Sequence, residues 1–203
     1  MSFDSKADKW DTEYNIERAK IISDELISSI ETNKDFEVLD FGCGTGLISF
    51  NLKDYFKSIT LVDLSQGMID KVNEKISVYN TNNMKAFKTD INAEGLKNMN
   101  FDLIYTSMAL HHIIDVKKTL KELHKVLKDN GKLCIIELCE ENGDFHKSFP
   151  NFKGHNGFDP EVMKEWVKKS GFKNIDYKII FENYKNPETK EVPYKLFMLI
   201  AKK

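Results

Sequence analysis

A glycine-rich segment, Val-Leu-Asp-Phe-Gly-Cys-Gly-Thr-Gly at residues 38–46, separates a short apolar run from a helical pattern. Glycines permit positive φ angles and let a ligand approach the backbone, although a plain tight connection would look the same. Asp63 ends the next apolar run, where it could accept both hydroxyls of a ribose or act as an acidic helix cap. Asp90 ends the following run, where it could accept from an adenine amine beside Ile91 or lie in a solvated turn. Together these features predict an adenosine-containing ligand.

The charge around the glycine-rich turn distinguishes between adenosine ligands. A dinucleotide carries a pyrophosphate, which favours helix N-terminal amides and no neighbouring anion. Asp40 lies just before the turn, where its carboxylate would repel a diphosphate and would suit the ammonium of a methionine-derived ligand, directly or through water. The chain also contains no Gly-Lys-Ser/Thr sequence, so a P-loop is absent. These observations favour S-adenosylmethionine over NAD as the cofactor.

Histidine is the side chain best suited to accept a proton near neutral pH. His111 and His112 follow the fourth apolar run and are the first candidates for a general base, although at least one of them is expected to be packed. His155 lies in a polar loop that could close over the same edge, or could be solvated. His124 and His146 are predicted to be peripheral, and no Cys/His spacing predicts a metal site.

Apolar runs alternate with helical patterns along the chain, which indicates a parallel sheet with helices on both faces. A helix is expected at 15–32, and the helix that Asp115 caps is expected to stop at Asn130-Gly131. Ser65 and Asp159 are expected to cap two further helices. The expected strands are 36–41, 58–64, 84–88, 101–106, 132–138, 174–183 and 192–201, the last two joined by a turn at 185–188.

The order of these elements predicts where a ligand binds. In open sheets of this kind, ligands lie beyond the carboxyl ends of the strands, at the point where the strand order reverses. The glycine turn, Asp63, Asp90 and residues 107–112 all follow strands and are therefore expected along one edge.

Composition limits the class of protein. The 203 residues suit a single domain, and 30 basic against 32 acidic residues give a net charge of −2. This balance provides no broad basic field, so nucleic acid is not expected as a partner. Three cysteines, Cys43, Cys134 and Cys139, are expected to be reduced thiols in a cytoplasmic protein. No signal peptide or membrane-spanning run is expected, and the oligomeric state is left open.

The motifs resemble those of class I S-adenosylmethionine-dependent methyltransferases of the small-molecule type. The similarity covers Val-Leu-Asp-Phe-Gly-Cys-Gly-Thr-Gly, Leu-Val-Asp-Leu-Ser, Thr-Asp-Ile, Phe-Asp-Leu-Ile with Ala-Leu-His-His-Ile, and Val-Leu-Lys-Asp-Asn-Gly-Lys-Leu. In the last motif, Asn130 stands where many members have glycine. Members that methylate exocyclic base or amide nitrogens often have Asn-Pro-Pro-Tyr after the fourth strand, whereas this chain has Ser-Met-Ala-Leu.

The resemblance implies a Rossmann-like, mostly parallel seven-stranded sheet with the last strand antiparallel. It also implies a cofactor site in which the glycine turn holds the methionine part, Asp63 binds the ribose, and the turn after strand four lies nearest the methyl group. Met68 could equally belong to the core. The cofactor-binding residues expected on this basis are Asp40, Gly42, Cys43, Gly44, Gly46, Asp63, Leu64, Met68, Asp90, Ile91, Ser107 and Met108.

The sequence therefore predicts one methyltransferase domain over residues 1–203. It is divided into an N-terminal helical cap (1–35), a cofactor-binding core (36–139) and a C-terminal part with a substrate-side loop (140–203). The expected function is methyl transfer from S-adenosylmethionine to a small-molecule acceptor by in-line displacement. An NAD(P)-dependent oxidoreductase and a non-catalytic S-adenosylmethionine-binding protein are the alternatives. Three N-terminal aromatic residues could line the acceptor site as a lid or dock the first helix on the core: Phe3, Trp10 and Tyr14.

Overall fold

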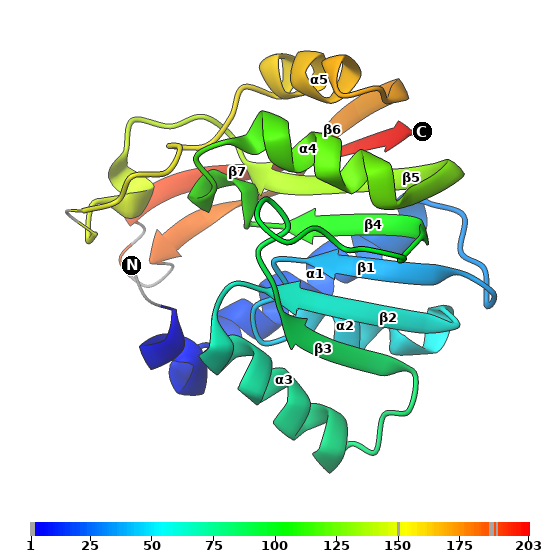
Figure 1. The fold of residues 1–203 in the computed structure, drawn as a ribbon. Helices are drawn as coiled ribbons and strands as arrows, with labels where there is room; N and C mark the ends of the chain where they lie inside the picture. The colour runs from blue at the N-terminus through cyan, green and yellow to red at the C-terminus, as the bar shows by residue number, and fades with distance from the viewer. Residues whose placement is uncertain (1–2, 150, 187–188, 190) are drawn as a thin grey trace.

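A seven-stranded sheet forms the centre of the computed structural model, which describes residues 3–149, 151–186, 189 and 191–203. The strand order is β3-β2-β1-β4-β5-β7-β6, and β7 is antiparallel to both of its neighbours while the other pairs are parallel (Figure 1). The strands are β1 (Glu37–Phe41), β2 (Ser58–Asp63), β3 (Met84–Lys88), β4 (Phe101–Ser107), β5 (Leu127–Leu138), β6 (Lys173–Asn186) and β7 (Glu191–Lys202). The expected Rossmann-like sheet with an antiparallel last strand is confirmed.

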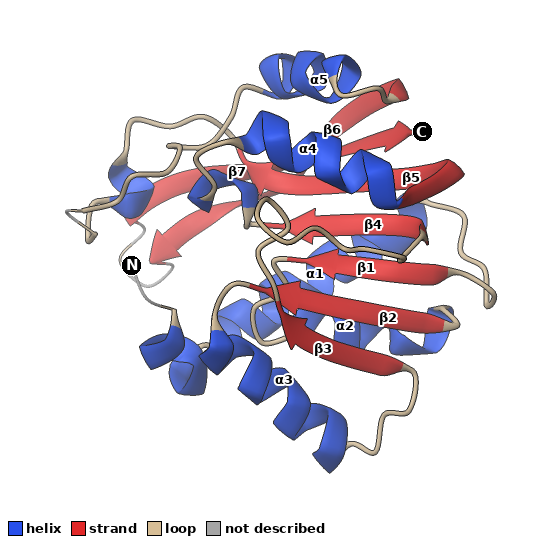
Figure 2. Cartoon of the chain, viewed as in Figure 1, coloured by secondary structure: helices blue, strands red, loops and turns tan. Residues whose placement is uncertain are grey.

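Helices cover both faces of the sheet, with α4 and α5 in front and α1 and α2 behind in the view of Figure 2. Successive strand residues point to opposite faces, so Val38 packs with α1, α2 and α3 while Leu39 packs with α4 and α5. The helices are α1 (Glu13–Ser29), α2 (Leu47–Leu52), α3 (Gln66–Val78), α4 (Val116–Val126) and α5 (Pro160–Lys169), with 3-10 turns η1 (Asp4–Lys9), η2 (Lys53–Tyr55), η3 (Leu110–His112) and η4 (Asp144–His146). No helix among the described residues is long and apolar enough to cross a membrane.

Side-chain caps begin three helices at the expected residues. The Ser65 hydroxyl accepts from the N–H of Met68, the Asp115 carboxylate accepts from the N–H of Lys118, and Asp159 accepts from two N–H groups in the first turn of α5. Each cap satisfies backbone donors that have no partner within the helix. These short-range contacts explain why the helix starts could be predicted from residue type.

The expected helix stop at Asn130-Gly131 is wrong, because α4 already ends at Val126. Strand β5 begins directly at Leu127, and its pairing with β4 is irregular until Lys132. Asn130 adopts a φ of 64° inside this irregular stretch. The Asn-Gly pair therefore marks a bulged strand start and not a helix terminus.

The turn expected between the last two strands lies partly outside the described residues. In the expected turn at 185–188, Lys185 and Asn186 belong to β6, whereas residues 187 and 188 lie outside the described residues.

The sheet topology brings the chemistry-bearing turns together. Strand β1 pairs with β2 on one side and with β4 on the other, so the chain reverses its direction of winding between β1 and β4. The glycine turn follows β1, and residues 107–112 follow β4, at the same edge. Such a reversal point leaves a crevice at the carboxyl ends of the strands.

Helix α4 provides a test of the packing that holds this edge. Leu120 is fully buried between α4 and the sheet, so Leu120→Ala should lower the free energy of unfolding by about 2–5 kcal/mol. The neighbouring Lys121→Ala is the matched control, because Lys121 is exposed and should change stability by less than about 0.5 kcal/mol. Urea unfolding followed by circular dichroism measures both, and equal effects would contradict the packing.

Candidate functional site at the carboxyl edge of the sheet

A cavity of about 1000 Å³ opens at the carboxyl ends of β1, β2 and β4. Its walls come from the turns after the strands, from the N-terminal segment and α1, and from the loop after β5. The expected site residues that line it are Gly42, Cys43, Gly44, Asp63, Leu64, Met68, Asp90, Ile91, Ser107, Met108 and His112. Residues from both the expected cofactor site and the expected acceptor site thus share one cavity.

The glycine turn needs its glycines for conformation and for space. Gly42 and Gly44 have φ angles of 73° and 53°, which side chains rarely adopt. A Cβ on Gly42 would lie 2.3 Å from the Cβ of Ala109, so only glycine lets the turn after β1 pass the turn after β4. Gly46, also at positive φ, is the N-cap of α2 and is not among the cavity-lining residues.

Asp63 joins the turn after β1 to the turn after β2. Its Oδ2 accepts from the N–H of Gly44 at 2.9 Å, and its Oδ1 accepts from the N–H of Ser65 at 2.9 Å. Burial raises the pKa of this carboxyl, although the backbone donors oppose the shift. Ser65 provides the side-chain cap of α3, so Asp63 is not that cap. Each carboxylate oxygen of Asp63 retains a further acceptor position beside the cavity.

Asp40 lies behind the glycine turn and does not line the cavity. It is 3% exposed, and its Oδ2 accepts a 2.6 Å hydrogen bond from Ser49. The hydroxyl of Tyr105 lies 2.6 Å from the Ser49 oxygen and completes a buried polar chain. Burial raises the pKa of Asp40 to about 7, against the opposing effect of these hydroxyls. Any effect of Asp40 on a bound ligand must therefore pass through the turn or a water molecule.

The part of the cavity beyond Asp63 combines apolar walls with a carboxylate. Leu64 is 56% exposed although it is a large apolar side chain, whereas Met68 and Ile91 are buried. Met68 therefore belongs to the packed helix face and borders the cavity as well. Asp90 lies beside them, and its Oδ1 accepts from the N–H of Asn92 at 2.9 Å.

The N-terminal segment closes over the cavity, and its aromatic residues divide between the two expected roles. Phe3 and Trp10 line the cavity, whereas the hydroxyl of Tyr14 hydrogen-bonds to that of Tyr194 and docks α1 on the sheet. Asp4 and Asp11 hold the segment in place, by contacts that the sequence did not indicate. Asp4 accepts from the Ser65 hydroxyl and the Gly67 N–H, and Asp11 accepts from the Thr45 hydroxyl and pairs with Lys75.

Arg18 is a cavity-lining cation that sequence reasoning missed. Its guanidinium donates to Asn15 at 3.0 Å and to the hydroxyl of Tyr194 at 3.5 Å. A guanidinium has five N–H donors, so these two bonds leave further donors for a ligand. An Asn and an Arg three positions apart on a helix look like an ordinary solvated face in the sequence, and only the docking of α1 reveals the difference.

The histidines expected as bases occupy different surroundings. His111 is 1% exposed, with Nδ1 2.8 Å from the Oε2 atom of Glu137, so the expected packed member of the pair is His111. His112 lines the cavity, and burial lowers its pKa to about 3, with nearby positive charge acting in the same direction. His155 is not among the lining residues. Its Nε2 lies 3.0 Å from the carbonyl oxygen of Ile113, where it fixes the loop.

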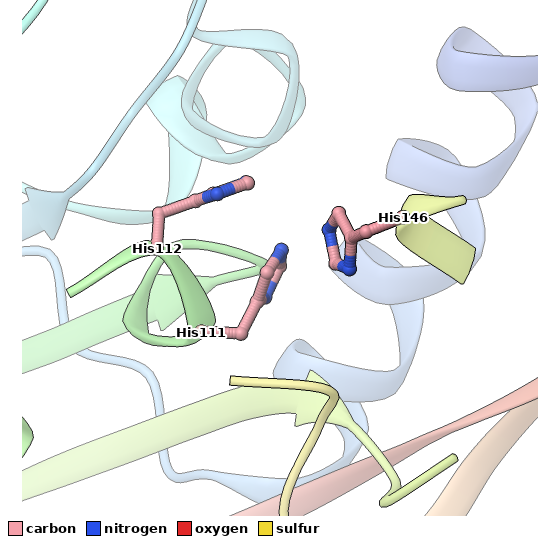
Figure 3. Close-up of side chains that lie close together, drawn as sticks. All are labelled: His111, His112 and His146. Atoms are coloured by element: carbon pink, nitrogen blue, oxygen red, sulfur yellow. The ribbon is translucent and has the colours of Figure 1, made fainter. Parts of the chain in front are cut away.

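The expectation that His146 is peripheral is wrong. His146 is buried, and its ring centroid lies 5.1 Å from that of His111 and 5.6 Å from that of His112 (Figure 3). It comes from η4, in the long loop after β5, which the sequence did not predict to contain a helical turn. His124 contacts Phe172 away from the cavity, as expected for a peripheral residue.

The loop after β5 folds over the cavity. Residues 151–154 line the cavity, and the N–H of His155 donates to the carbonyl of His111 at 2.7 Å. Met108, on the facing turn, has a φ of 55° while its N–H donates to Ile136. Such strained non-glycine conformations concentrate at functional sites because the surrounding structure must enforce them.

Comparisons with known proteins identify relatives of the whole core. The sequence model of a methyltransferase domain family matches residues 14–177. An uncharacterized methyltransferase of Schizosaccharomyces pombe is 30% identical over 180 residues, which are 80% of this chain and 63% of that protein. Demethylmenaquinone methyltransferase of Chlamydia pneumoniae is 30% identical over 146 residues, which are 70% of this chain and 59% of that protein. The chain spans only 4% of a hybrid synthetase of Penicillium citrinum that it also matches.

Solved structures show the same fold at low sequence identity. A putative methyltransferase of Haloferax volcanii, in complex with the Trm112 activator, superimposes with a TM-score of 0.80 at 14% identity and covers 98% of this chain and 96% of that chain. Phosphoethanolamine N-methyltransferase 2 of Haemonchus contortus, in complex with S-adenosylmethionine, gives 0.76 at 16% identity and covers 100% of this chain and 60% of that chain.

Burial of Asp40 generates a prediction about pH and stability. Its pKa is raised in the folded state, so the folded protein binds more protons than the unfolded chain between about pH 4 and pH 7. Stability contributed by the protonated carboxyl is therefore lost as pH rises through this window. Asp40→Asn removes the titration and can still accept from Ser49. Its free energy of unfolding relative to wild type should rise by about 4 kcal/mol between pH 4 and pH 8.

Urea unfolding at several pH values measures this difference, which should be smallest at pH 4, where the folded Asp40 side chain is protonated and uncharged, as asparagine is. A constant difference across the whole range would show that Asp40 is not held in the buried environment described above.

Proposed function

Since the chain belongs to the class I S-adenosylmethionine-dependent methyltransferases, we propose that it transfers a methyl group from S-adenosylmethionine to a small-molecule acceptor. The observation that carries the proposal is the position of Asp63. Its carboxylate spans two strand ends, faces a cavity, and retains one acceptor position on each oxygen. A ribose offers two neighbouring hydroxyl donors that match these positions.

The surroundings of Asp63 fit the rest of a nucleoside. Exposed Leu64, with Met68 and Ile91, provides apolar surface that a flat adenine ring would cover, which explains why a leucine stands uncovered there. Asp90, which follows β3, is placed to accept a hydrogen bond from the exocyclic amine of the adenine. We assign these four residues to the adenine.

The glycine turn and Arg18 fit the methionine part. The open backbone of Gly42 and Gly44 lets this part lie close to the turn, with Cys43 beside them. Arg18 supplies donors for its carboxylate. Burial raises the pKa of Asp40, behind the turn, to about 7, and a cationic ligand nearby would favour its ionised form. Gly46 shapes the turn as the N-cap of α2.

The cofactor supplies a methyl group on a positively charged sulfur, which already makes it an active donor. The protein has to align the acceptor with this methyl group and exclude water. Ser107 and Met108, on the strained turn after β4, lie on the wall shared with the glycine turn and are assigned to the methyl-proximal region. The N-terminal segment and the 151–154 loop cover the cavity and help to exclude solvent from it.

The acceptor occupies the part of the cavity bounded by Phe3, His112 and Phe152. A total volume of about 1000 Å³ lies at the upper end of small-molecule sites and leaves room for a small acceptor beside the cofactor. Relatives carry names of methyltransferases for demethylmenaquinone, sterols and malonyl-acyl-carrier protein, which supports acceptors of varied chemistry on this fold. Among the histidines expected as catalytic, we assign His112 to the acceptor, with His111 and His155 supporting its turn.

Cofactor binding tests the nucleoside assignment. Asp63→Ala should weaken binding of S-adenosylhomocysteine by about 10- to 150-fold, the effect of losing hydrogen bonds worth about 1.5–3 kcal/mol. Titration calorimetry measures this, with Asp24→Ala as a control because Asp24 is exposed and is not among the cavity-lining residues. NAD should bind neither protein. Stabilisation by NAD in the absence of any effect of S-adenosylhomocysteine would overturn the cofactor assignment.

Turnover tests the assignment of His112. With S-adenosylmethionine carrying a trideuterated methyl group, a metabolite extract should yield at least one labelled product detectable by mass spectrometry. His112→Ala should slow formation of that product by about 100-fold, because the acceptor loses a side chain that positions it, with little change in S-adenosylhomocysteine affinity. His124→Ala is the matched control, since His124 lies away from the cavity. A wild-type rate in folded His112→Ala would remove His112 from the acceptor site.

A further inference from the structure

Three histidines from two separate loops converge beside the acceptor region. His111 and His112 lie in η3 after β4, and His146 lies in η4 after β5. Each offers one ring nitrogen, and these nitrogens all lie within 4.8 Å of one another. Figure 3 shows the three imidazoles facing a common space from two sides. Among the described residues, this is the group of histidine, cysteine and carboxylate side chains arranged closely enough to hold a metal ion.

Glu137 prepares His111 for this arrangement. Its Oε2 lies 2.8 Å from Nδ1 of His111, and its Oε1 accepts from the backbone N–H of the same residue. A carboxylate on Nδ1 fixes the tautomer and leaves Nε2 with its lone pair available. Metal-binding histidines almost always have such a partner on the nitrogen that does not bind the ion. Glu137 is itself fully buried in β5, so its only role visible in the structure is to hold His111 and the adjoining backbone.

His146 supplies an independent sign that a partner is missing. The residue is 5% exposed, and its Nδ1 is buried without a hydrogen-bond partner among the described residues. Its ring stacks on Phe152 at a centroid distance of 3.8 Å, so the imidazole is held firmly in place. Leaving a buried polar nitrogen unsatisfied is unfavourable, so His146 is a candidate for a partner that the described residues do not supply.

The three rings pack against one another. Their centroids lie 4.1 Å apart for His111 and His112, 5.1 Å apart for His111 and His146, and 5.6 Å apart for His112 and His146. The ring of His111 is bonded to Glu137 and not to either of the other two imidazoles, so the nitrogens that face one another are not joined within the cluster.

We propose that His111, His112 and His146 bind one divalent transition metal ion, with zinc the ion that best fits three imidazole ligands. Tetrahedral zinc has Zn–N distances of about 2.0–2.1 Å, which place its nitrogens about 3.3 Å apart. The side chains need to close by at most about 1.5 Å from their present separation. Three protein ligands leave a fourth coordination position open, as in catalytic zinc sites. Because His112 lines the cavity, an ion bound to it would lie beside the cavity.

This site deepens the proposed function, on which its chemical role rests. A hydroxyl or thiol acceptor that takes the fourth position would lose its proton to water, because a bound divalent ion stabilises the anion. The lone pair of that oxygen or sulfur forms the bond to the methyl carbon as the carbon–sulfur bond of the donor breaks, and the electrons of that bond remain on sulfur. His112 would then act as a ligand and not as a free base.

Metal titration tests the site without cofactor or acceptor, so its failure leaves the methyltransferase proposal untouched. The full chain, stripped with a chelator and dialysed, should bind one equivalent of Zn²⁺ by calorimetry and gain thermal stability. Co²⁺ should give the visible absorption of a tetrahedral complex. His146→Ala should weaken Zn²⁺ binding by at least about 100-fold, while His124→Ala should bind as wild type does. Glu137→Gln should weaken binding by about 10- to 100-fold, as for other partners of ligating histidines.

Circular dichroism of each metal-free variant establishes whether it is folded. If His146→Ala is not folded, His112→Ala provides a second variant that lacks a ligand. Zn²⁺ bound by a folded ligand variant as tightly as by wild type would place the ion elsewhere, for example on the free cysteines. Absence of Zn²⁺ and Co²⁺ binding by folded wild type would leave the three histidines as a packed cluster. Either result overturns the proposal.

Discussion

The close approach of Gly42 to Ala109 is the constraint on which the site depends. It sets the distance between the turn after β1 and the turn after β4, because any Cβ at position 42 would overlap the side chain at 109. The first turn carries the backbone assigned to the methionine part, and the second carries Met108 and His112. Donor and acceptor regions are therefore brought together by a contact that involves no ligand. The left-handed backbone at Met108 is part of the same arrangement, since its N–H remains bonded to β5.

The parts of this arrangement that could be predicted from sequence are those that depend on residues close together in the chain. Caps such as Ser65 and Asp159 act on backbone groups two or three residues away, the glycine turn directly follows β1, and Asp63 ends β2. Once the alternation of strands and helices indicates an open sheet, topology alone places these residues at one edge. The end of α4 was mispredicted for the converse reason. Pairing with β4 draws Leu127 into a strand before the local Asn-Gly signal is reached.

The unpredicted parts depend on contacts between distant segments. Arg18 reaches the cavity because α1 docks against β7, where Tyr194 receives both Arg18 and Tyr14. His146 meets His111 because the loop after β5 returns across η3, fixed by backbone bonds that carry no sequence signature. Burial also changes the charge state expected for the Asp40 carboxyl. Its negative charge is not simply available to a ligand, because desolvation raises its pKa to about 7, and a nearby cationic ligand would favour the ionised form.

The two covers of the cavity differ in how they are held, and this difference determines which one is easier to displace. The loop after β5 is tied down by backbone bonds from Glu140 and His155 and by the buried side chain of Phe145. The N-terminal turn η1 is held by side-chain contacts of Asp4, by the Asp8–Lys71 pair, in which Asp8 is largely exposed, and by one small buried side chain, Ala7. Exposed ion pairs contribute about 0–1 kcal/mol, much less than a buried apolar side chain. Movement of η1 is therefore the less costly opening, and because Phe3 borders the histidines while Trp10 borders the glycine turn, the same movement uncovers both halves of the site.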